Sequence, residues 1–199
     1  MTGGNEQLTA AVKAGERALR GQVRATSGLT VLTGGQTGVD TYAAVAALQA
    51  GLTVHLVLPS GYRQEDGPLT PGRRRRFAGG ILHELPSGSF RYRTWTCAYL
   101  ADAVLLLDPA GGSGCQETVR AATRLGRPLL ISRSGALTAA QTTAWLASTG
   151  ARVLMVAGCR ASVLASKGKG RGLRTELTGI MAGARQYHDG LLAGRQGGA

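Results

Sequence analysis

Long apolar runs are absent from this 199-residue sequence. The longest ones, such as Ala103–Leu107 and Val153–Ala157, are far shorter than the roughly 18–20 residues that a membrane-spanning helix needs. The chain also opens without the basic segment and following apolar segment that form a secretory leader. We therefore expect neither a membrane protein nor a secreted one.

Cysteine is scarce as well. The three cysteines, Cys97, Cys115 and Cys159, form no C-x-x-C pair, and no group of histidines and cysteines has the spacing of a zinc site. A small, odd number of thiols without such a pattern is typical of a reducing compartment. The sequence predicts a cytoplasmic protein without a structural metal ion.

Acidic and aromatic residues are few. The chain has 11 Asp and Glu against 23 Lys and Arg, a formal net charge of +12, and its aromatic content is 5%. The basic excess is compatible with an anionic ligand, with nucleic acid, or with a compositional bias towards arginine. Proteins dedicated to nucleic acid usually concentrate basic and aromatic side chains, whereas the arginines here are spread along the chain, with one run at Arg73–Arg76. We therefore expect only non-specific binding of nucleic acid.

Six short apolar runs alternate with helical segments after residue 28. The runs are Leu29–Thr33, Thr53–Leu58, Ile81–Leu85, Ala103–Leu107, Pro128–Ser132 and Arg152–Ala157. The helical segments lie near Val39–Ala50, Tyr92–Leu100, Glu117–Leu125, Thr138–Ser148 and Leu173–His188. Continuously apolar strands are buried on both faces, and strand–helix alternation requires right-handed crossovers. The pattern predicts an α/β fold: a doubly wound, mainly parallel sheet of five to seven strands with helices on both faces.

The length and the hydrophobic content of 43% indicate one main domain with a core of its own. Residues 1–28 are expected to form a peripheral N-terminal helical arm, and residues 29–160 the ligand-binding domain. Residues 161–199 are expected to form a basic, Gly-rich loop and a C-terminal helix packed on the same domain.

Two glycine-rich loops, Thr33–Asp40 and Pro109–Thr118, follow strands and precede helices. Glycine lets backbone N–H groups approach a ligand closely, and the N-terminus of the next helix carries partial positive charge. In a sheet of strand order 3-2-1-4-5 the first and fourth strands are neighbours, so both loops would flank the topological switch point. The loops predict a nucleotide-like or phosphate-bearing ligand, the alternative being two tight turns. The candidate binding residues are Gly34, Gly35, Gln36, Thr37, Gly38, Asp40, Gly111, Gly112, Ser113, Gly114 and Thr118.

Neither loop carries the signature of a common nucleotide enzyme. No Gly-Lys-Ser/Thr closes a Walker A motif, and neither loop is a strict G-x-G-x-x-G with an acidic residue on the next strand. ATP hydrolysis and ordinary dehydrogenase chemistry are therefore disfavoured. Asp40 lies in the first turn of its helix, where it either caps the loop or contacts a ribose or a water molecule.

Charged residues also follow the second strand, at the same edge of the predicted sheet. Arg63 is positioned to pair with an anion, and Glu65 and Asp66 to bind hydroxyls or amines. The alternative is a solvated turn with local salt bridges.

The helix before the fourth strand opens with Arg93 and Thr94. Arg93 either reaches the crevice or forms a salt bridge with Asp102. Trp95 is expected to serve packing rather than base stacking. Cys115 has no histidine nearby in the sequence, which argues against a Cys–His catalytic pair.

Several of these segments resemble the molybdenum cofactor carrier family. They are Gly34–Asp40, Gly61–Arg63, Glu65–Pro68, Arg93–Thr94, Ala101–Ala103 and Gly111–Ser113. That family belongs to a wider group of Rossmann-like nucleotide-binding proteins, which includes the cytokinin-activating (lysine decarboxylase-like) phosphoribohydrolases and the DNA-processing protein of natural transformation. The likeness covers about residues 29–132. It implies a Rossmann-like fold, a homo-oligomer, and binding of a phosphorylated pterin such as the molybdenum cofactor (molybdopterin), or of a nucleotide.

The sequence departs from these family patterns at informative positions. The carriers usually have an asparagine after the Arg-Thr pair, where this chain has Cys97. The phosphoribohydrolases have a Pro-Gly-Gly-x-Gly-Thr-x-x-Glu motif, and here Ala110, Cys115 and Thr118 replace its proline, threonine and glutamate. Loss of that carboxylate removes the expected catalytic acid or base, unless Glu117 takes its place.

The leading hypothesis is a binding protein that holds its ligand between the two glycine loops at the carboxyl edge of the sheet. Arg63 and Arg93 would supply positive charge, and any molybdenum would arrive within the cofactor. The alternative is a nucleoside monophosphate phosphoribohydrolase that uses Glu117. A third hypothesis is a nucleic-acid-binding accessory protein.

Overall fold

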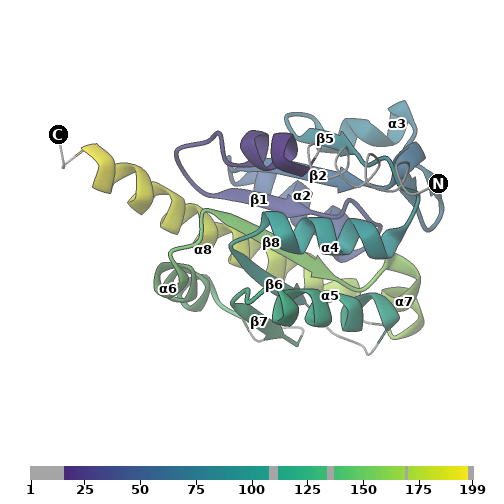
Figure 1. The fold of residues 1–199 in the computed structure, drawn as a ribbon. Coiled ribbons are helices and arrows are strands. Elements are labelled where there is room, and N and C mark those ends of the chain that lie inside the picture. Colours follow the sequence, from purple (N-terminus) through teal and green to yellow (C-terminus); the bar gives the residue numbers. More distant parts are fainter. Residues whose placement is uncertain (1–15, 108–111, 134–136, 169, 197–199) are drawn as a thin grey trace.

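The computed structural model describes residues 16–107, 112–133, 137–168 and 170–196. Its central feature is a six-stranded sheet in which all neighbouring strands run parallel (Figure 1). In sheet order the strands are β5 (Ile81–Glu84), β2 (Thr53–Leu58), β1 (Thr30–Thr33), β8 (Val153–Gly158), β6 (Ala103–Leu107) and β7 (Leu129–Ser132). Each strand lies within one residue of an apolar run in the sequence, so the predicted α/β sheet is confirmed.

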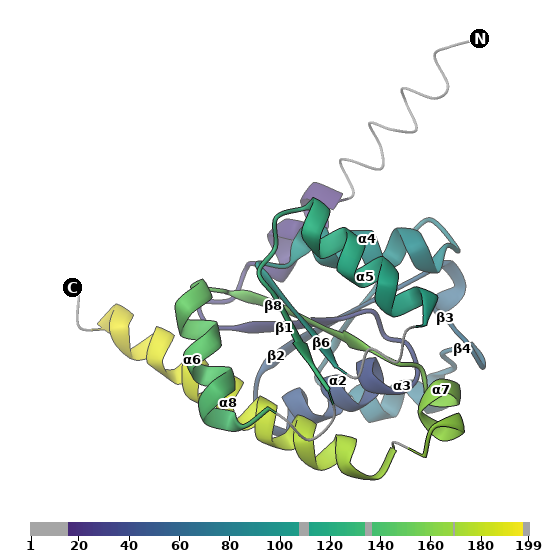
Figure 2. The same ribbon diagram turned by 90° about the horizontal axis from the view of Figure 1, so that it is seen from below.

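Helices cover both faces of the sheet (Figure 2). On one face lie α2 (Val39–Gln49), α6 (Ala139–Thr149) and the long α8 (Gly170–Gln196), which contacts the other two. On the other face α4 (Phe90–Leu100) packs beside α5 (Ser113–Arg124). Two covered faces explain why β1, β2, β6 and β8 are almost wholly buried without polar alternation.

The strand order corrects one expectation. The first and fourth strands of the sequence are not neighbours, because β8 lies between them and pairs with both β1 and β6. All residues of Val153–Ala157 are buried, so this last apolar run is best accommodated at the centre of the sheet, where both faces are covered. The end of β8 therefore reaches the switch point between the two glycine loops.

Short elements occupy segments for which the sequence predicts loops. After β2 come η1 (Ser60–Tyr62), a two-stranded ribbon of β3 (Arg63–Gln64) and β4 (Gly67–Pro68), then α3 (Pro71–Arg74) and η2 (Arg75–Phe77). After β8 comes α7 (Ala161–Ser166). Helix α5 begins at Ser113, earlier than expected, so Ser113 and Gly114 form its first turn instead of a loop.

The N-terminal segment is described from residue 16, and residues 16–23 form a helix. Leu19 and Val23 are buried from this helix, and the Glu16 carboxylate accepts a hydrogen bond from the Tyr92 hydroxyl of α4 at 3.2 Å. Arg24 forms an ion pair with Asp102, the residue that precedes β6. Within the described residues, no helix is both long and apolar enough to cross a membrane.

A pair of histidines links β2 to β5. Nδ1 of His55 and Nε2 of His83 lie 2.7 Å apart, and the His55 side chain is 1% exposed. Burial, together with repulsion from His83, lowers the pKa of His55 from its usual 6.5 to about 4. The imidazole is therefore neutral in the folded protein at pH 7.

This depressed pKa predicts a loss of stability in mild acid. The unfolded chain binds the proton at a higher pH than the folded one, so stability falls as the pH decreases through 6.5 towards 4. Between pH 7.5 and pH 5 the free energy of unfolding should drop by about 2 kcal/mol from this group. Urea titrations at the two pH values measure the drop, and a His55→Leu variant should lose most of it. An equal drop in that variant would assign the effect to other groups.

Candidate functional site

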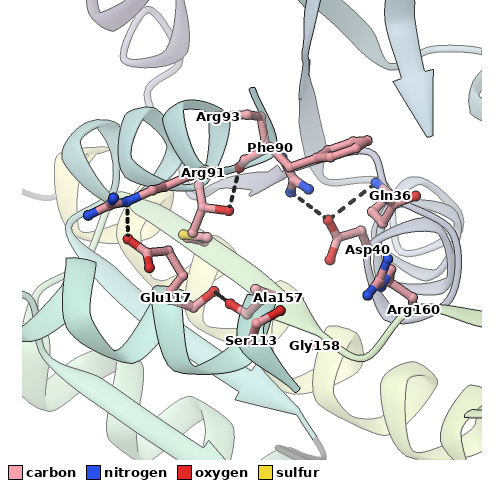
Figure 3. Close-up of a pocket in the computed structure, with 14 residues that line it drawn as sticks. Gln36, Asp40, Phe90, Arg91, Arg93, Ser113, Glu117, Ala157, Gly158 and Arg160 are labelled. Carbon is pink, nitrogen blue, oxygen red and sulfur yellow. Dashed lines mark hydrogen bonds and ion pairs between the residues drawn. The ribbon is translucent and has the colours of Figure 1, made fainter. Parts of the chain in front are cut away.

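A cleft of about 290 Å³ opens at the carboxyl edge of the sheet (Figure 3). It lies between the loop after β1, the N-terminal ends of α4 and α5, and the end of β8. Its lining residues are Gln36, Asp40, Phe90, Arg91, Arg93, Thr94, Ser113, Gly114, Glu117, Thr118, Met155, Ala157, Gly158 and Arg160. β1 leads to α2 on one face of the sheet and β6 leads to α5 on the other (Figure 2), and the crevice at such a reversal is the usual ligand position in doubly wound folds.

The first glycine loop places an aspartate at the N-terminus of α2. The Asp40 carboxylate accepts the backbone N–H of Gln36 at 3.3 Å and Nη1 of Arg93 at 3.1 Å (Figure 3). Burial raises the pKa of Asp40, and attraction to Arg93 opposes that shift. The Asp40 side chain therefore links the first glycine loop to α4.

The glycines of this loop lie so close to neighbouring protein atoms that a side chain would collide with them. A Cβ on Gly34 would lie 1.3 Å from Nη1 of Arg93, and a Cβ on Gly35 would lie 2.7 Å from Cγ of Leu58. Gly38 has a φ of +80°, and its Cβ would lie 2.4 Å from the carbonyl oxygen of Cys159. The loop is thus packed tightly against its neighbours, with the Arg93 guanidinium resting on Gly34.

Backbone donors of the same loop also bind protein acceptors. The N–H of Thr37 donates to Oε1 of its neighbour Gln36 at 2.9 Å, and the N–H of Val39 donates to the carbonyl of Cys159 at 3.1 Å. From this loop and the start of α2, Gln36 and Asp40 line the cleft.

Helix α4 contributes most of the positive charge. Its N-cap Ser89 accepts the N–H of Tyr92, so the first turn presents its side chains at the cleft. Arg93 is 7% exposed and pairs with Asp40, whereas Asp102 pairs with Arg24. Of the two roles expected for Arg93, the structure therefore shows the position at the crevice and not the salt bridge with Asp102. The Nε of Arg93 is buried and has no hydrogen-bond partner among the described residues.

Helix α5 brings a carboxylate to the opposite wall. Glu117 accepts hydrogen bonds from Nε1 of Trp95 at 2.5 Å and from Arg91 at 2.9 Å, and it forms an ion pair with Arg120 at 3.1 Å. The Trp95 hydrogen bond, followed by the two arginines, lowers the pKa of Glu117. Glu117 is therefore ionised at neutral pH, and Trp95 has a polar role in addition to packing.

The end of β8 completes the floor of the cleft, and the sequence reasoning missed it. Met155, Ala157, Gly158 and Arg160 line the cleft from this strand and the turn after it. Gly158 permits close packing, because a Cβ there would lie 2.5 Å from the carbonyl oxygen of Leu107. The available signal was a glycine and an arginine directly after an apolar run, at the edge where ligands bind.

Eight of the predicted site residues line the cleft, namely Gln36, Asp40, Arg93, Thr94, Ser113, Gly114, Glu117 and Thr118. The described residues Gly34, Gly35, Thr37 and Gly38 of the first loop do not line it, nor does Gly112, the N-cap of α5. Gly111 lies outside the described residues.

The charged residues after β2 form contacts of their own. The guanidinium of Arg63 lies over the ring of Phe90, 5.6 Å from its centroid, and Asp66 pairs with Arg73 at 2.5 Å. Glu65 accepts hydrogen bonds from Thr37 and Ser162. Burial favours a higher pKa for Glu65, but the hydrogen bonds outweigh it, and the pKa of Glu65 is lowered. The turn between β3 and β4 therefore connects the first glycine loop to α7 through Glu65, and it does not line the cleft.

Within the described residues, no group of three or more histidine, cysteine, aspartate or glutamate side chains is arranged to hold a metal ion. The cleft holds three arginines, Arg91, Arg93 and Arg160, against the carboxylates of Asp40 and Glu117. Arg160 also pairs with Glu65 at 3.8 Å, so each of the three arginines has a carboxylate partner, and the residues that line the cleft include one more basic than acidic side chain.

Comparison with known protein families identifies the family of this chain. The model of the circularly permutated YpsA SLOG family matches residues 31–169. The chain belongs to this family. The matched range contains all six strands except the first residue of β1, so family and fold agree on the Rossmann-like architecture that the resemblance implied.

This member of the circularly permutated YpsA SLOG family is also similar to a solved structure. That structure, at 1.45 Å resolution, is of the "Putative molybdenum carrier protein" from Syntrophus aciditrophicus SB, with 20% sequence identity and a TM-score of 0.64. The match covers 78% of this chain and 95% of that one. A likeness this remote shows the shared fold. No protein with a curated description matches the sequence.

Proposed function

We propose that the protein binds a phosphorylated pterin or a nucleotide in the cleft, and that its natural ligand is the molybdenum cofactor or a related phosphate-bearing molecule. One observation carries the proposal: Arg93, 7% exposed and paired with Asp40 through Nη1, lines a cleft at the topological switch point and has a buried Nε without a hydrogen-bond partner among the described residues. A buried donor without an acceptor costs about 1–3 kcal/mol. An oxygen of a bound anion would remove that cost.

The surroundings of Arg93 suit the phosphate end of such a ligand. Arg91 and Arg160 line the same cleft, and their side chains are 72% and 52% exposed. Each is paired with a carboxylate, Arg91 with Glu117 at 2.9 Å and Arg160 with Glu65 at 3.8 Å, and would exchange that partner for an anion of the ligand. The N-terminal turn of α5 adds Ser113 and Gly114, where the helix carries partial positive charge. Charge-assisted hydrogen bonds of this kind are the strong ones in ligand recognition.

The cleft also fits the remainder of such a ligand. Its volume of about 290 Å³ is near the lower end of the range for small-molecule sites, and Phe90, Met155 and Ala157 add an apolar wall. In the molybdenum cofactor, the pterin would bring its own molybdenum. Arg91, Arg93 and Arg160 would hold its phosphate. The solved structure of similar fold, named "Putative molybdenum carrier protein", supports this choice of ligand.

The proposal is tested first by mass spectrometry of small molecules released from the native purified protein. Recovery of a pterin phosphate or a nucleotide in stoichiometric amount is expected. Calorimetry with AMP and with 6-hydroxymethylpterin phosphate then measures affinity. Release of no such molecule, combined with absence of heat for both probes, would contradict the proposal.

Variants of the cleft give the sharper prediction. Gly114 lines the cleft, and a Cβ there meets nothing within 4 Å, so Gly114→Leu should fill the cleft without disturbing the core and weaken binding at least about tenfold. Arg160→Gln should weaken it by about 10–100-fold through loss of a charged hydrogen bond. The matched controls are Gly190→Leu, at an equally open position on α8, and Arg124→Gln, on the exposed side of α5. Equal affinities in variants and controls would place the ligand elsewhere.

A second candidate function is hydrolysis of nucleoside monophosphates, because Glu117 does reach the cleft. Its pKa, however, is lowered, so at neutral pH it has no proton to donate to a departing base. Both of its oxygens also already accept hydrogen bonds, Oε1 from Trp95 and Arg91 and Oε2 from Arg120, which opposes a role as the general base for water. We therefore expect that the wild-type protein incubated with AMP releases no more adenine than a Glu117→Ala control, as measured by chromatography. Adenine release that disappears in the variant would establish the hydrolase.

A further inference from the structure

We propose that Cys115 and Cys159 form a reversible intramolecular disulfide that reshapes the cleft. Their sulfur atoms lie 3.9 Å apart, although the residues are 44 positions apart in the sequence. Cys115 is in the first turn of α5 and Cys159 directly follows β8. The coupling to ligand binding rests on the proposed function, whereas the disulfide itself does not.

The two positions suit a cross-link between elements. A disulfide has an S–S distance of about 2.05 Å, so the sulfurs, now 3.9 Å apart, must approach by about 2 Å for the bond to form. Both cysteines lie at ends of elements, where the backbone yields more readily than within a strand or helix. Burial is high but incomplete: Cys115 is 6% exposed and Cys159 is 4% exposed.

The cleft is adjacent to both cysteines. Gly114 precedes Cys115, and Gly158 and Arg160 flank Cys159; all three line the cleft. The carbonyl of Cys159 also accepts the N–H of Val39 at the start of α2. Drawing the two sulfurs together would therefore move two walls of the cleft and pull on the first glycine loop.

The disulfide between Cys115 and Cys159 would form by thiol–disulfide exchange, with a small-molecule disulfide as the oxidant. The thiolate of one cysteine attacks a sulfur of the oxidant, forming a mixed disulfide and releasing the first small-molecule thiolate. The second cysteine, as its thiolate, attacks the protein sulfur of the mixed disulfide and releases the second small-molecule thiolate. Two electrons pass to the oxidant, and the protons of the two cysteines end on the two released thiols.

The third cysteine provides an internal control. Cys97 in α4 is fully buried, and burial raises the pKa of its thiol to about 12. Exchange requires a thiolate, so Cys97 should remain reduced under conditions that oxidise the pair.

The experiment incubates the full-length protein with defined ratios of oxidised to reduced glutathione, followed by acid quenching and peptide mapping without reductant. A peptide joining Cys115 to Cys159 is expected in the wild type and in Cys97→Ser, and not in Cys115→Ser or Cys159→Ser. Reduction should reverse it. Glutathione adducts without the cross-link, or cross-links that involve Cys97 in folded protein, would overturn the proposal.

Two readouts then test the effect on the cleft. Hydrogen exchange of residues 112–118 and 158–162 should slow on oxidation, and this measurement needs no ligand. The affinity for AMP should differ at least about threefold between the oxidised and reduced forms. A cross-link that changes neither readout would overturn the coupling. Absence of AMP binding in both forms, with slowed exchange, would count against AMP as a ligand while supporting the disulfide.

Discussion

Replacing Arg93 with methionine is expected to lower the free energy of unfolding by about 3–5 kcal/mol, because it leaves the carboxylate of Asp40 buried without its partner. The side chains of the pair are 9% and 4% exposed, so water cannot compensate for the loss. Urea unfolding of the wild type and the variant at pH 7.5 measures the difference.

Two further measurements assign this cost to the ion pair. A double variant, Arg93→Met with Asp40→Asn, should lose less than the sum of the two single variants, since no unpaired charge remains. In Arg93→Met the buried Asp40 can also relieve its charge by binding a proton. Because burial raises the pKa of Asp40 in the folded state, proton binding by this group stabilises the folded variant as the pH falls. The difference in the free energy of unfolding between wild type and variant should therefore decrease from pH 8 to pH 6. A pH-independent gap below about 1 kcal/mol would mean that the pair does not hold the loop.

Gly38→Ala is expected to have a comparable effect for a different reason. Gly38 has a φ of +80° and a ψ of −129°, a conformation that only glycine adopts readily. The added Cβ would lie 2.4 Å from the carbonyl oxygen of Cys159 and 2.6 Å from the backbone nitrogen of Ala161. Strain of about 1–3 kcal/mol and overpacking of a similar size together predict a loss of about 2–6 kcal/mol.

The matched control is Gly190→Ala in α8, where a Cβ meets nothing within 4 Å. That variant should be neutral or more stable by about 0.5–1 kcal/mol, because alanine favours a helix over glycine. Thermal or urea unfolding of both variants makes the comparison. If Gly38→Ala kept wild-type stability, the close approach of the first glycine loop to the end of β8 would not be a constraint on the fold.

The sequence by itself determined the strands, most of the helices and the edge of the sheet that carries the site. Runs such as Ala103–Leu107 and Val153–Ala157 are apolar throughout, and only a strand covered on both faces is stable with that pattern. Asp40 and Arg93 were identified as candidates because residues at the starts of helices gather at one edge of a parallel sheet, and both line the cleft. Local pattern and chain direction are sufficient for inferences of this kind. Glu117, which also lines the cleft, was identified through the resemblance to the phosphoribohydrolases.

Only the tertiary structure decided which groups meet at that edge. The insertion of β8 between β1 and β6 depends on long-range pairing that no local pattern specifies, and it brings Gly158 and Arg160 into the cleft. The pairing of Arg93 with Asp40 and of Arg24 with Asp102 likewise follows from how the helices pack. Sequence spacing gives the direction of a side chain within its own element, whereas the partner of a charge depends on which elements fold against it.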